Sequence, residues 1–352
     1  MTRGESTGSG FFQGLESMDR ITELAKKLRP IYRLHPNEKY FPIDFRDYIA
    51  RSAIYVDGEV VATRPTPADV HALMSPGGAL AGTPAFGDWT RYDWGGGRVV
   101  LKILDEERAR MRRGDKTLSA KQTCMARPGT DKNGAYLEGT VNLFYNTWWG
   151  YNGTIGMAPI GGFITGSEYS VGAHETDIET VMLNVNLETG SVNHVMLAQH
   201  NKGTWYNFKD FKKDHGRMVV FVAKHSHEHY PIDGTVYRSE TYLAGNDVTG
   251  KGSMFYPDVE MVPFFWGGQN YRIPGVSDAI TTLKVDTGGL YVRNQDLSPD
   301  TSWMALPVAI WKTPDEHGPW SLYETKKNST WHASNNKPAI LQTKVSRWLP
   351  WL

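Results

Sequence analysis

The sequence predicts an all-β protein, an antiparallel β-sandwich of the jelly-roll type with a few short peripheral helices. Short segments of alternating apolar and polar residues are separated by turn residues, with 36 Gly and 19 Pro in 352 residues, as is typical of sandwiches. Hydrophobic residues make up 40% of the chain, enough for a sizeable core. No repeat or linker divides the sequence. We therefore expect a flexible tail over residues 1–14 and a single β-sandwich domain with insertions over 15–352.

Three segments are predicted to be helices. The first follows Ser17, a good N-cap residue, and ends before Pro30. Its apolar residues recur at helical spacing: Met18, Ile21, Leu24 and Leu28. The second begins at Thr66, an N-cap residue followed by a proline at the first helical position. The third covers 105–113 and stops at Gly114. Its four arginines are predicted to form a solvated face in preference to an anion site: Arg108, Arg110, Arg112 and Arg113.

Most of the remaining chain is predicted to form strands. Apolar and polar residues alternate over 137–145, which indicates a strand with two different faces. The unbroken apolar run 218–223 suits a strand buried on both faces. Further strands are expected over 281–285, 289–292 and 304–311.

The charge balance excludes one class of function. Lys plus Arg and Asp plus Glu each total 38, so the formal net charge is zero, and we expect no nucleic-acid partner. The single cysteine, Cys124, forms no intramolecular disulfide, which favours a reducing compartment. We find neither a signal peptide nor a transmembrane segment, so a cytoplasmic location is expected, with peripheral membrane contact left open.

The most informative segment is 172–179. Side chains alternate along a strand, so Asp177 and Glu179 share one face with the apolar residues that follow them. Two partly buried carboxylates need partners, and a divalent cation satisfies both. His174 lies three residues before Asp177 and can reach the same cation. The alternative is that both carboxylates are solvated at the end of a strand.

Several segments, in order, resemble the vacuolar protein sorting-associated protein 62 family. Residues 34–42 (LHPNEKYFP) resemble its N-terminal signature, and 144–153 its aromatic segment ending in Asn-Gly. Residues 172–179 resemble its G-x-H-x-x-D-W-E element, with Ile178 in place of Trp. The segments 199–203 and 223–231 resemble its two downstream histidine elements.

The H-x-x-D-x-E element also resembles that of the necrosis- and ethylene-inducing-like proteins, a secreted β-sandwich family. That resemblance implies a divalent cation held by His174, Asp177 and Glu179, with an upstream acid for which Glu168 is the nearest candidate. The second histidine of that family's motif is replaced here by Thr176. The family recognises a membrane glycolipid, so a lipid head group or glycan ligand is also implied.

Two further histidines and three aromatic residues are candidates for the same site. His200 ends a strand-like run, and His227 follows the buried run 218–223. Both are candidate general bases, or else hydrogen-bonding residues that hold loops. Trp148, Trp149 and Tyr151 are candidate ligand-binding residues, although a core position is the preferred interpretation. The apolar C-terminal segment 348–352 is expected to dock on the body or on a partner.

The predicted function is recognition of a small molecule, lipid head group or glycan by a metal-centred cleft. Oxygen ligands predominate in the predicted set, which favours Mg²⁺, Ca²⁺ or Mn²⁺ over Zn²⁺. The alternative is a metal-dependent hydrolase or lyase with a histidine base. The sequence leaves both classes open, together with the ligand and the oligomeric state.

Overall fold

The computed structural model describes residues 15–74, 77–79, 99–132, 136–153, 155–156, 170–171, 174–199, 202–236, 247–261, 265–266, 290–291 and 309–311. Strands dominate these residues, and several antiparallel sheets with few short helices confirm the predicted sandwich-like, all-β fold. The predicted tail over 1–14, the expected strand over 281–285 and the C-terminal segment 348–352 lie outside the described residues.

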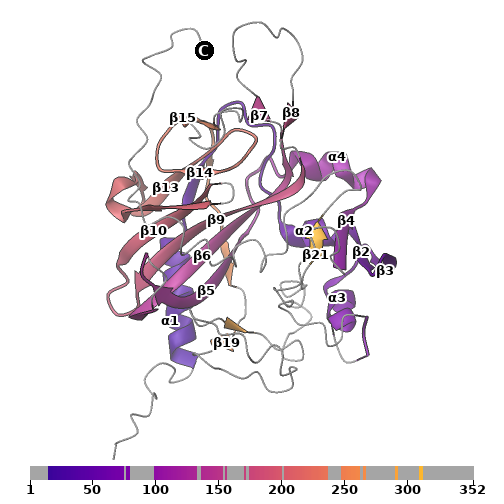
Figure 1. Ribbon diagram of the computed structural model, residues 1–352, viewed down its shortest axis with the longest axis horizontal. Helices are drawn as coiled ribbons and strands as arrows, with labels where there is room; N and C mark the ends of the chain where they lie inside the picture. The colour runs from indigo at the N-terminus through magenta and orange to yellow at the C-terminus, as the bar shows by residue number, and fades with distance from the viewer. Residues whose placement is uncertain are drawn as a thin grey trace, which may run out of the picture.

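The described helices lie around the strands (Figure 1). They are α1 (Leu15–Leu28), α2 (Phe45–Ala50), α3 (Pro67–Met74), α4 (Asp105–Arg113) and the 3-10 helix η2 (Phe208–Asp210). Helix α1 begins two residues before Ser17, so this serine occupies the first turn and not the N-cap position. Ile21 and Leu24 are buried, as their spacing predicts. None of the described helices is long and apolar enough to cross a membrane.

The second predicted helix begins, and the third ends, where the sequence predicts. The Thr66 hydroxyl accepts a hydrogen bond from the Asp69 N–H at 3.2 Å, and the Asp69 carboxylate accepts one from the Thr66 N–H at 2.8 Å. This reciprocal pair caps α3. Helix α4 ends at Gly114, whose φ of 67° a residue with a side chain rarely adopts.

The largest sheet has six strands in the order β11-β10-β9-β6-β5-β18. Their bounds are β5 (Gln122–Thr130), β6 (Tyr136–Asn152), β9 (His174–Asn186), β10 (Val192–Gln199), β11 (Lys202–Tyr206) and β18 (Val259–Met261). Strands β5 to β11 pair antiparallel, whereas β18 pairs parallel with β5. The longest ladder joins β6 to β9, from Thr140 opposite Asn186 to Asn152 opposite His174.

A second sheet lies against one face of this sheet. It contains β1 (Ile31–Arg33), β12 (Lys213–Asp214), β13 (Arg217–Val222), β14 (His229–Tyr230) and β17 (Met254–Phe255). Its centre is a parallel pair, β1 with β13. One hydrophobic core includes residues of both sheets, among them Tyr32, Val220, Leu143 and Val181. The sandwich is therefore mixed in strand direction.

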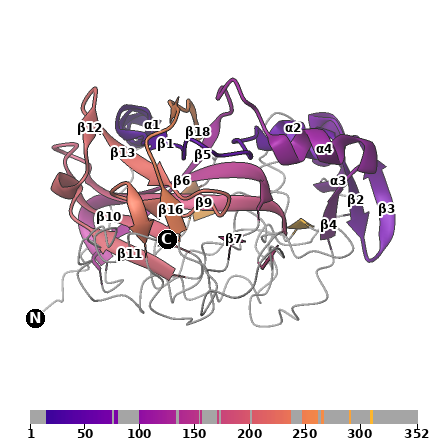
Figure 2. The ribbon, with the colours of Figure 1, turned by 90° about the horizontal axis from the view of Figure 1, so that it is seen from above.

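A smaller sheet extends from one end of the sandwich, beside α2, α3 and α4 (Figure 2). Its order is β21-β4-β2-β3, with bounds β2 (Ser52–Val56), β3 (Glu59–Thr63), β4 (Val99–Ile103) and β21 (Ala309–Trp311). Three two-stranded ladders complete the described strands: β7 (Ile155–Gly156) with β8 (Ser170–Val171), β15 (Gly234–Val236) with β16 (Asp247–Thr249), and β19 (Phe265–Trp266) with β20 (Leu290–Tyr291).

The alternation over 137–145 predicts a strand but misleads about its polar face. That face of β6 is buried as well, with Asn142 and Asn146 each at most 1% exposed. Its side chains form a hydrogen-bonded ladder with β9, in which the Asn184 amide donates to Asn142 Oδ1 at 2.7 Å. Buried polar groups are tolerated when they are paired in this way.

Candidate functional site

The inner face of the β6–β9 ladder, the face that meets the second sheet, ends in carboxylates. Opposed residues of an antiparallel pair share a face, so Thr147 lies beside Glu179 and Trp149 beside Asp177. Asp177 is 7% exposed and Glu179 is 5% exposed. We call these four residues the carboxylate end of the inner face. Both acids are thus buried, not solvated at a strand end.

The histidine loop, residues 223–228 between β13 and β14, brings His227 to this end. The His227 ring stacks on the Trp149 indole with ring centroids 4.0 Å apart and planes 1° from parallel. Its Nδ1 lies 3.1 Å from Asp177 Oδ2. His225 and His227 have φ values of 66° and 59°, a left-handed conformation that costs a residue other than glycine about 1–3 kcal/mol. The surrounding contacts must therefore hold this loop in place.

Glu38, which is not among the site residues predicted from the sequence, supplies one of those contacts. Its Oε2 accepts a hydrogen bond from the His225 N–H at 2.7 Å. Its Oε1 accepts from the N–H groups of Lys39 and Tyr40 at 2.9 and 3.0 Å, and lies 4.0 Å from His227 Nε2. The one available signal was its place in the 34–42 segment that carries the family resemblance.

Further acids lie within and beside the histidine loop. Burial, together with the nearby Asp247 and Glu179 carboxylates, raises the pKa of Glu228 well above its ordinary value. Asp247 accepts hydrogen bonds from the Ser226 hydroxyl at 3.0 Å and the Tyr230 hydroxyl at 2.5 Å. Acidic groups therefore crowd this region, and a divalent cation can offset the repulsion between those that are ionised.

The arginines of α4 correct the prediction of a solvated face. Arg112 Nε donates to Glu175 Oε1 at 2.5 Å, and Arg108 Nε lies 3.6 Å from the same oxygen. The Glu175 side chain is fully buried, so it is these two arginines that neutralise it. The Arg112 guanidinium also lies 4.4 Å above the Tyr151 ring. Arg110 is half exposed, as predicted.

The structure places the three candidate aromatic residues in the interior, as the core interpretation predicts. Trp148 is 1% exposed and Trp149 is fully buried, while Tyr151 is 9% exposed. Trp148 stacks on Phe45 at 4.7 Å, and its indole N–H donates to Thr123 Oγ1 at 3.2 Å. A role of any of the three in ligand binding stays a prediction.

Of the candidate ligands and bases, the structure brings together Asp177, Glu179 and His227. The backbone of His174 begins β9 opposite Asn152, but its side chain lies outside the described part of the chain, as do Glu168 and His200. Within the described residues, no group of three or more His, Cys, Asp or Glu side chains is arranged to hold a metal ion. The predicted set depends on His174 for its third ligand.

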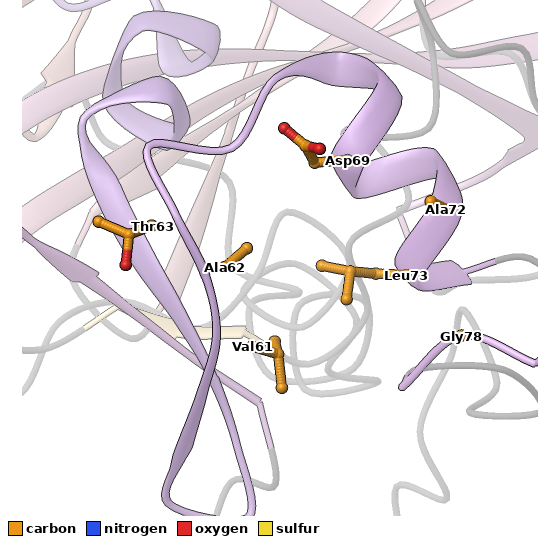
Figure 3. A pocket seen from close by; sticks show the side chains of 7 residues that line it. All are labelled: Val61, Ala62, Thr63, Asp69, Ala72, Leu73 and Gly78. Carbon is orange, nitrogen blue, oxygen red and sulfur yellow. The ribbon is translucent and has the colours of Figure 1, made fainter.

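A cavity of about 390 Å³ lies elsewhere, between strand β3 of the smaller sheet and helix α3 (Figure 3). It is lined by Val61, Ala62, Thr63, Asp69, Ala72, Leu73 and Gly78. Its one acidic lining residue, Asp69, caps α3 through Thr66. None of the candidate site residues lines this cavity, so it does not bear on the predicted chemistry.

The chain matches one family of known proteins. The family model of vacuolar protein sorting-associated protein 62 matches residues 9–253, more than half of the sequence. The chain belongs to this family. No curated protein matches it.

Solved structures of the second family that the sequence resembles are also similar. Necrosis and Ethylene inducing Protein 2, from the causal agent of cocoa's Witches Broom disease, has a TM-score of 0.31 and 13% identity, covering 68% of this chain and 72% of that chain. NLPPya in complex with glucosamine has a TM-score of 0.31 and 11% identity, covering 70% of this chain and 75% of that chain.

Proposed function

We propose that the chain is a cation-dependent recognition protein. In this proposal His174, Asp177 and Glu179 hold a divalent cation in a cleft that binds a lipid head group or glycan. The observation that carries it is the burial of Asp177 and Glu179 on one face of β9. Asp177 pairs with His227 Nδ1 at 3.1 Å, and a divalent cation would offset the mutual repulsion of the two neighbouring buried carboxylates.

The surrounding charges support a cation at this point. Glu38 and Glu228 also lie near the carboxylate end, and Arg108 and Arg112 of α4 are engaged by Glu175. Hard oxygen ligands favour Mg²⁺, Ca²⁺ or Mn²⁺. Glu168 is retained in the proposal as a further acidic ligand.

The proposed ligand contacts lie at the outer end of the ladder. The Tyr40 ring, which is partly exposed, lies 5.0 Å from the Tyr151 ring and 5.4 Å from the His225 ring, both edge-on. Aromatic rings with polar edges suit sugars and polar head groups. Trp148 and Trp149 would support this rim from the interior.

A second candidate is a metal-dependent hydrolase or lyase, favoured by the 3.1 Å separation of His227 Nδ1 and Asp177 Oδ2. A general base must reach a substrate proton directly or through one water. One face of the His227 ring is covered by Trp149, and its two nitrogens are directed at Asp177 and Glu38. This arrangement favours the recognition protein.

The cation is tested by elemental analysis and by calorimetric titration of the metal-stripped protein with Mg²⁺, Ca²⁺ and Mn²⁺. We expect one bound cation in the native protein and loss of binding in Asp177→Asn and Glu179→Gln. The matched control Asp69→Asn removes an acid that caps a helix and should bind as the native protein does. A native protein without a cation, and without any response to a chelator, would overturn the proposal.

The ligand is tested separately, with neutral and anionic vesicles and a glycan array, each with and without EDTA. Recognition predicts binding that EDTA abolishes and that His227→Ala alters only modestly once the cation is saturating. A turnover that is lost in His227→Ala by about 10²-fold or more would support the enzyme instead.

A further inference from the structure

The 34–42 segment carries part of the family resemblance, and the proposed function uses only the charge of Glu38 and the ring of Tyr40 from it. We propose that Glu38 is a positioning residue of the cation site. It fixes the histidine loop and thereby the direction of His227 toward Asp177. This inference rests on the proposed function, because the loop that Glu38 holds affects the cation site through His227.

The contacts of Glu38 show that it acts within the protein and not on a ligand. Its side chain is 1% exposed. Three backbone N–H groups occupy its two oxygens: those of Lys39 and Tyr40 on Oε1, and that of His225 on Oε2. A carboxylate bonded in this way is a charged, geometrically fixed acceptor. It joins a segment near the start of the chain to a loop almost two hundred residues later.

The loop that Glu38 holds needs such an anchor. His225 and His227 both adopt left-handed φ values, and such strain persists only where several contacts fix the backbone. Two backbone hydrogen bonds also hold the loop: the Gly153 N–H donates to His225 O at 2.8 Å, and the His227 N–H donates to Ala223 O at 3.1 Å. Glu38 adds a side-chain contact to these. A Cβ at Gly153 would lie 2.4 Å from the Tyr40 ring and 2.9 Å from His225 Cβ.

The consequence for the site follows from the position of His227. Its ring is set between the Trp149 indole, the Asp177 carboxylate and the Glu38 carboxylate. Release of the His225 N–H would let the loop relax, and Asp177 would lose a fixed neighbour. Groups that orient metal ligands in this way typically change metal affinity by about 10- to 100-fold when removed.

The test compares Glu38→Gln and Glu38→Ala with the control Asp115→Ala. Asp115 is a matched loop carboxylate, since it accepts from the backbone N–H groups of Thr117 and Ser119 and touches no residue of the histidine loop in any described hydrogen bond. Two readouts are used: the histidine-ring ¹⁵N signals by NMR in the metal-stripped protein, and the Mg²⁺, Ca²⁺ and Mn²⁺ dissociation constants by calorimetry. Gln keeps one acceptor oxygen and the side-chain shape, so it carries the test if the Ala variant does not fold.

We expect both Glu38 variants to shift or broaden the His227 ring signals and to raise the dissociation constant of the bound cation about 10-fold or more. The Asp115 variant should stay within about twofold of the native value, whatever its melting temperature. Unchanged His227 signals and affinity in Glu38→Gln would overturn the inference, as would an equal loss in the Asp115 control. If the native protein binds no cation, the proposed function fails, and the NMR signals alone still decide the role of Glu38.

Discussion

The two halves of the inner face of the β6–β9 ladder differ sharply although they lie on the same two strands. In one half, which we call the aliphatic half, Leu143 lies opposite Leu183 and Tyr145 opposite Val181. In the other, which we call the carboxylate half, Trp149 lies opposite Asp177. The register does not shift between the two halves. The aliphatic half therefore fixes where the carboxylates lie, since a one-residue slip would turn both sets to the other face.

The two halves should also differ in what they contribute to the free energy of unfolding. Burial of aliphatic side chains stabilises the fold by roughly 25 cal/mol per Å². Burial of acids opposes folding unless each is paired, and the raised pKa of Glu228 is a direct sign of this cost. We therefore expect stability to depend on one half and recognition on the other.

The largest effect is expected in the aliphatic half. Leu183 is fully buried, so Leu183→Ala should lower the free energy of unfolding by about 2–5 kcal/mol. Urea denaturation measures this loss. The control Val60→Ala, at a side chain 52% exposed, should stay within about 0.5 kcal/mol. A loss below about 1 kcal/mol at Leu183 would mean that the stability of the ladder does not depend mainly on this half.

The next largest loss of stability is expected at the ion pair beside the carboxylate half. Arg112→Ala would leave the buried Glu175 with Arg108 at 3.6 Å as its nearest described cation, and should destabilise by about 3 kcal/mol. Arg110→Ala, on the exposed side of the same helix, should cost at most about 1 kcal/mol. Equal losses in the two variants would restore the solvated face that the sequence predicts.

Glu228 gives the carboxylate half a pH dependence. Its folded pKa is raised above the ordinary value of 4.5, so the folded protein keeps a proton that the unfolded chain has released. Its contribution to stability is complete below about pH 4.5 and is lost as the pH rises toward the folded pKa, by at most about 1.4 kcal/mol per pH unit. Glu228→Gln cannot lose that proton.

The Glu228→Gln variant should therefore gain stability over the native protein as the pH rises from 4.5 to 7.5. Urea denaturation with EDTA at several pH values measures the difference between the two proteins. Parallel stability curves would show that Glu228 ionises in the folded state as it does in the unfolded chain.

The sequence predicted the two halves unequally. Periodicity is a local property, so the strand over 137–145, the helices at 66–74 and 105–113, and the shared face of Asp177 and Glu179 were all accessible from it. Contacts between distant segments were not. Nothing local indicates that Glu38 holds the histidine loop, that Arg112 neutralises Glu175, or that β1 pairs parallel with β13. These depend on how the two sheets stack. A polar residue in an alternating strand also does not reveal whether its face is solvated or, like Asn142, buried and paired.

The smallest stability effect should come from the substitution most damaging to function. Glu179→Met replaces a buried acid of similar volume by an apolar side chain, which makes the carboxylate half resemble the aliphatic half. Removing one of several neighbouring buried carboxylates relieves their mutual repulsion and the cost of burying a charge. It also removes one of the charges that raise the pKa of Glu228. The melting temperature in EDTA should therefore be unchanged or slightly higher, while the increase that the native protein shows on adding the cation should disappear. A substantial destabilisation in EDTA would mean that Glu179 supports the fold through its own contacts, and that the division of the ladder into a stabilising half and a functional half does not hold.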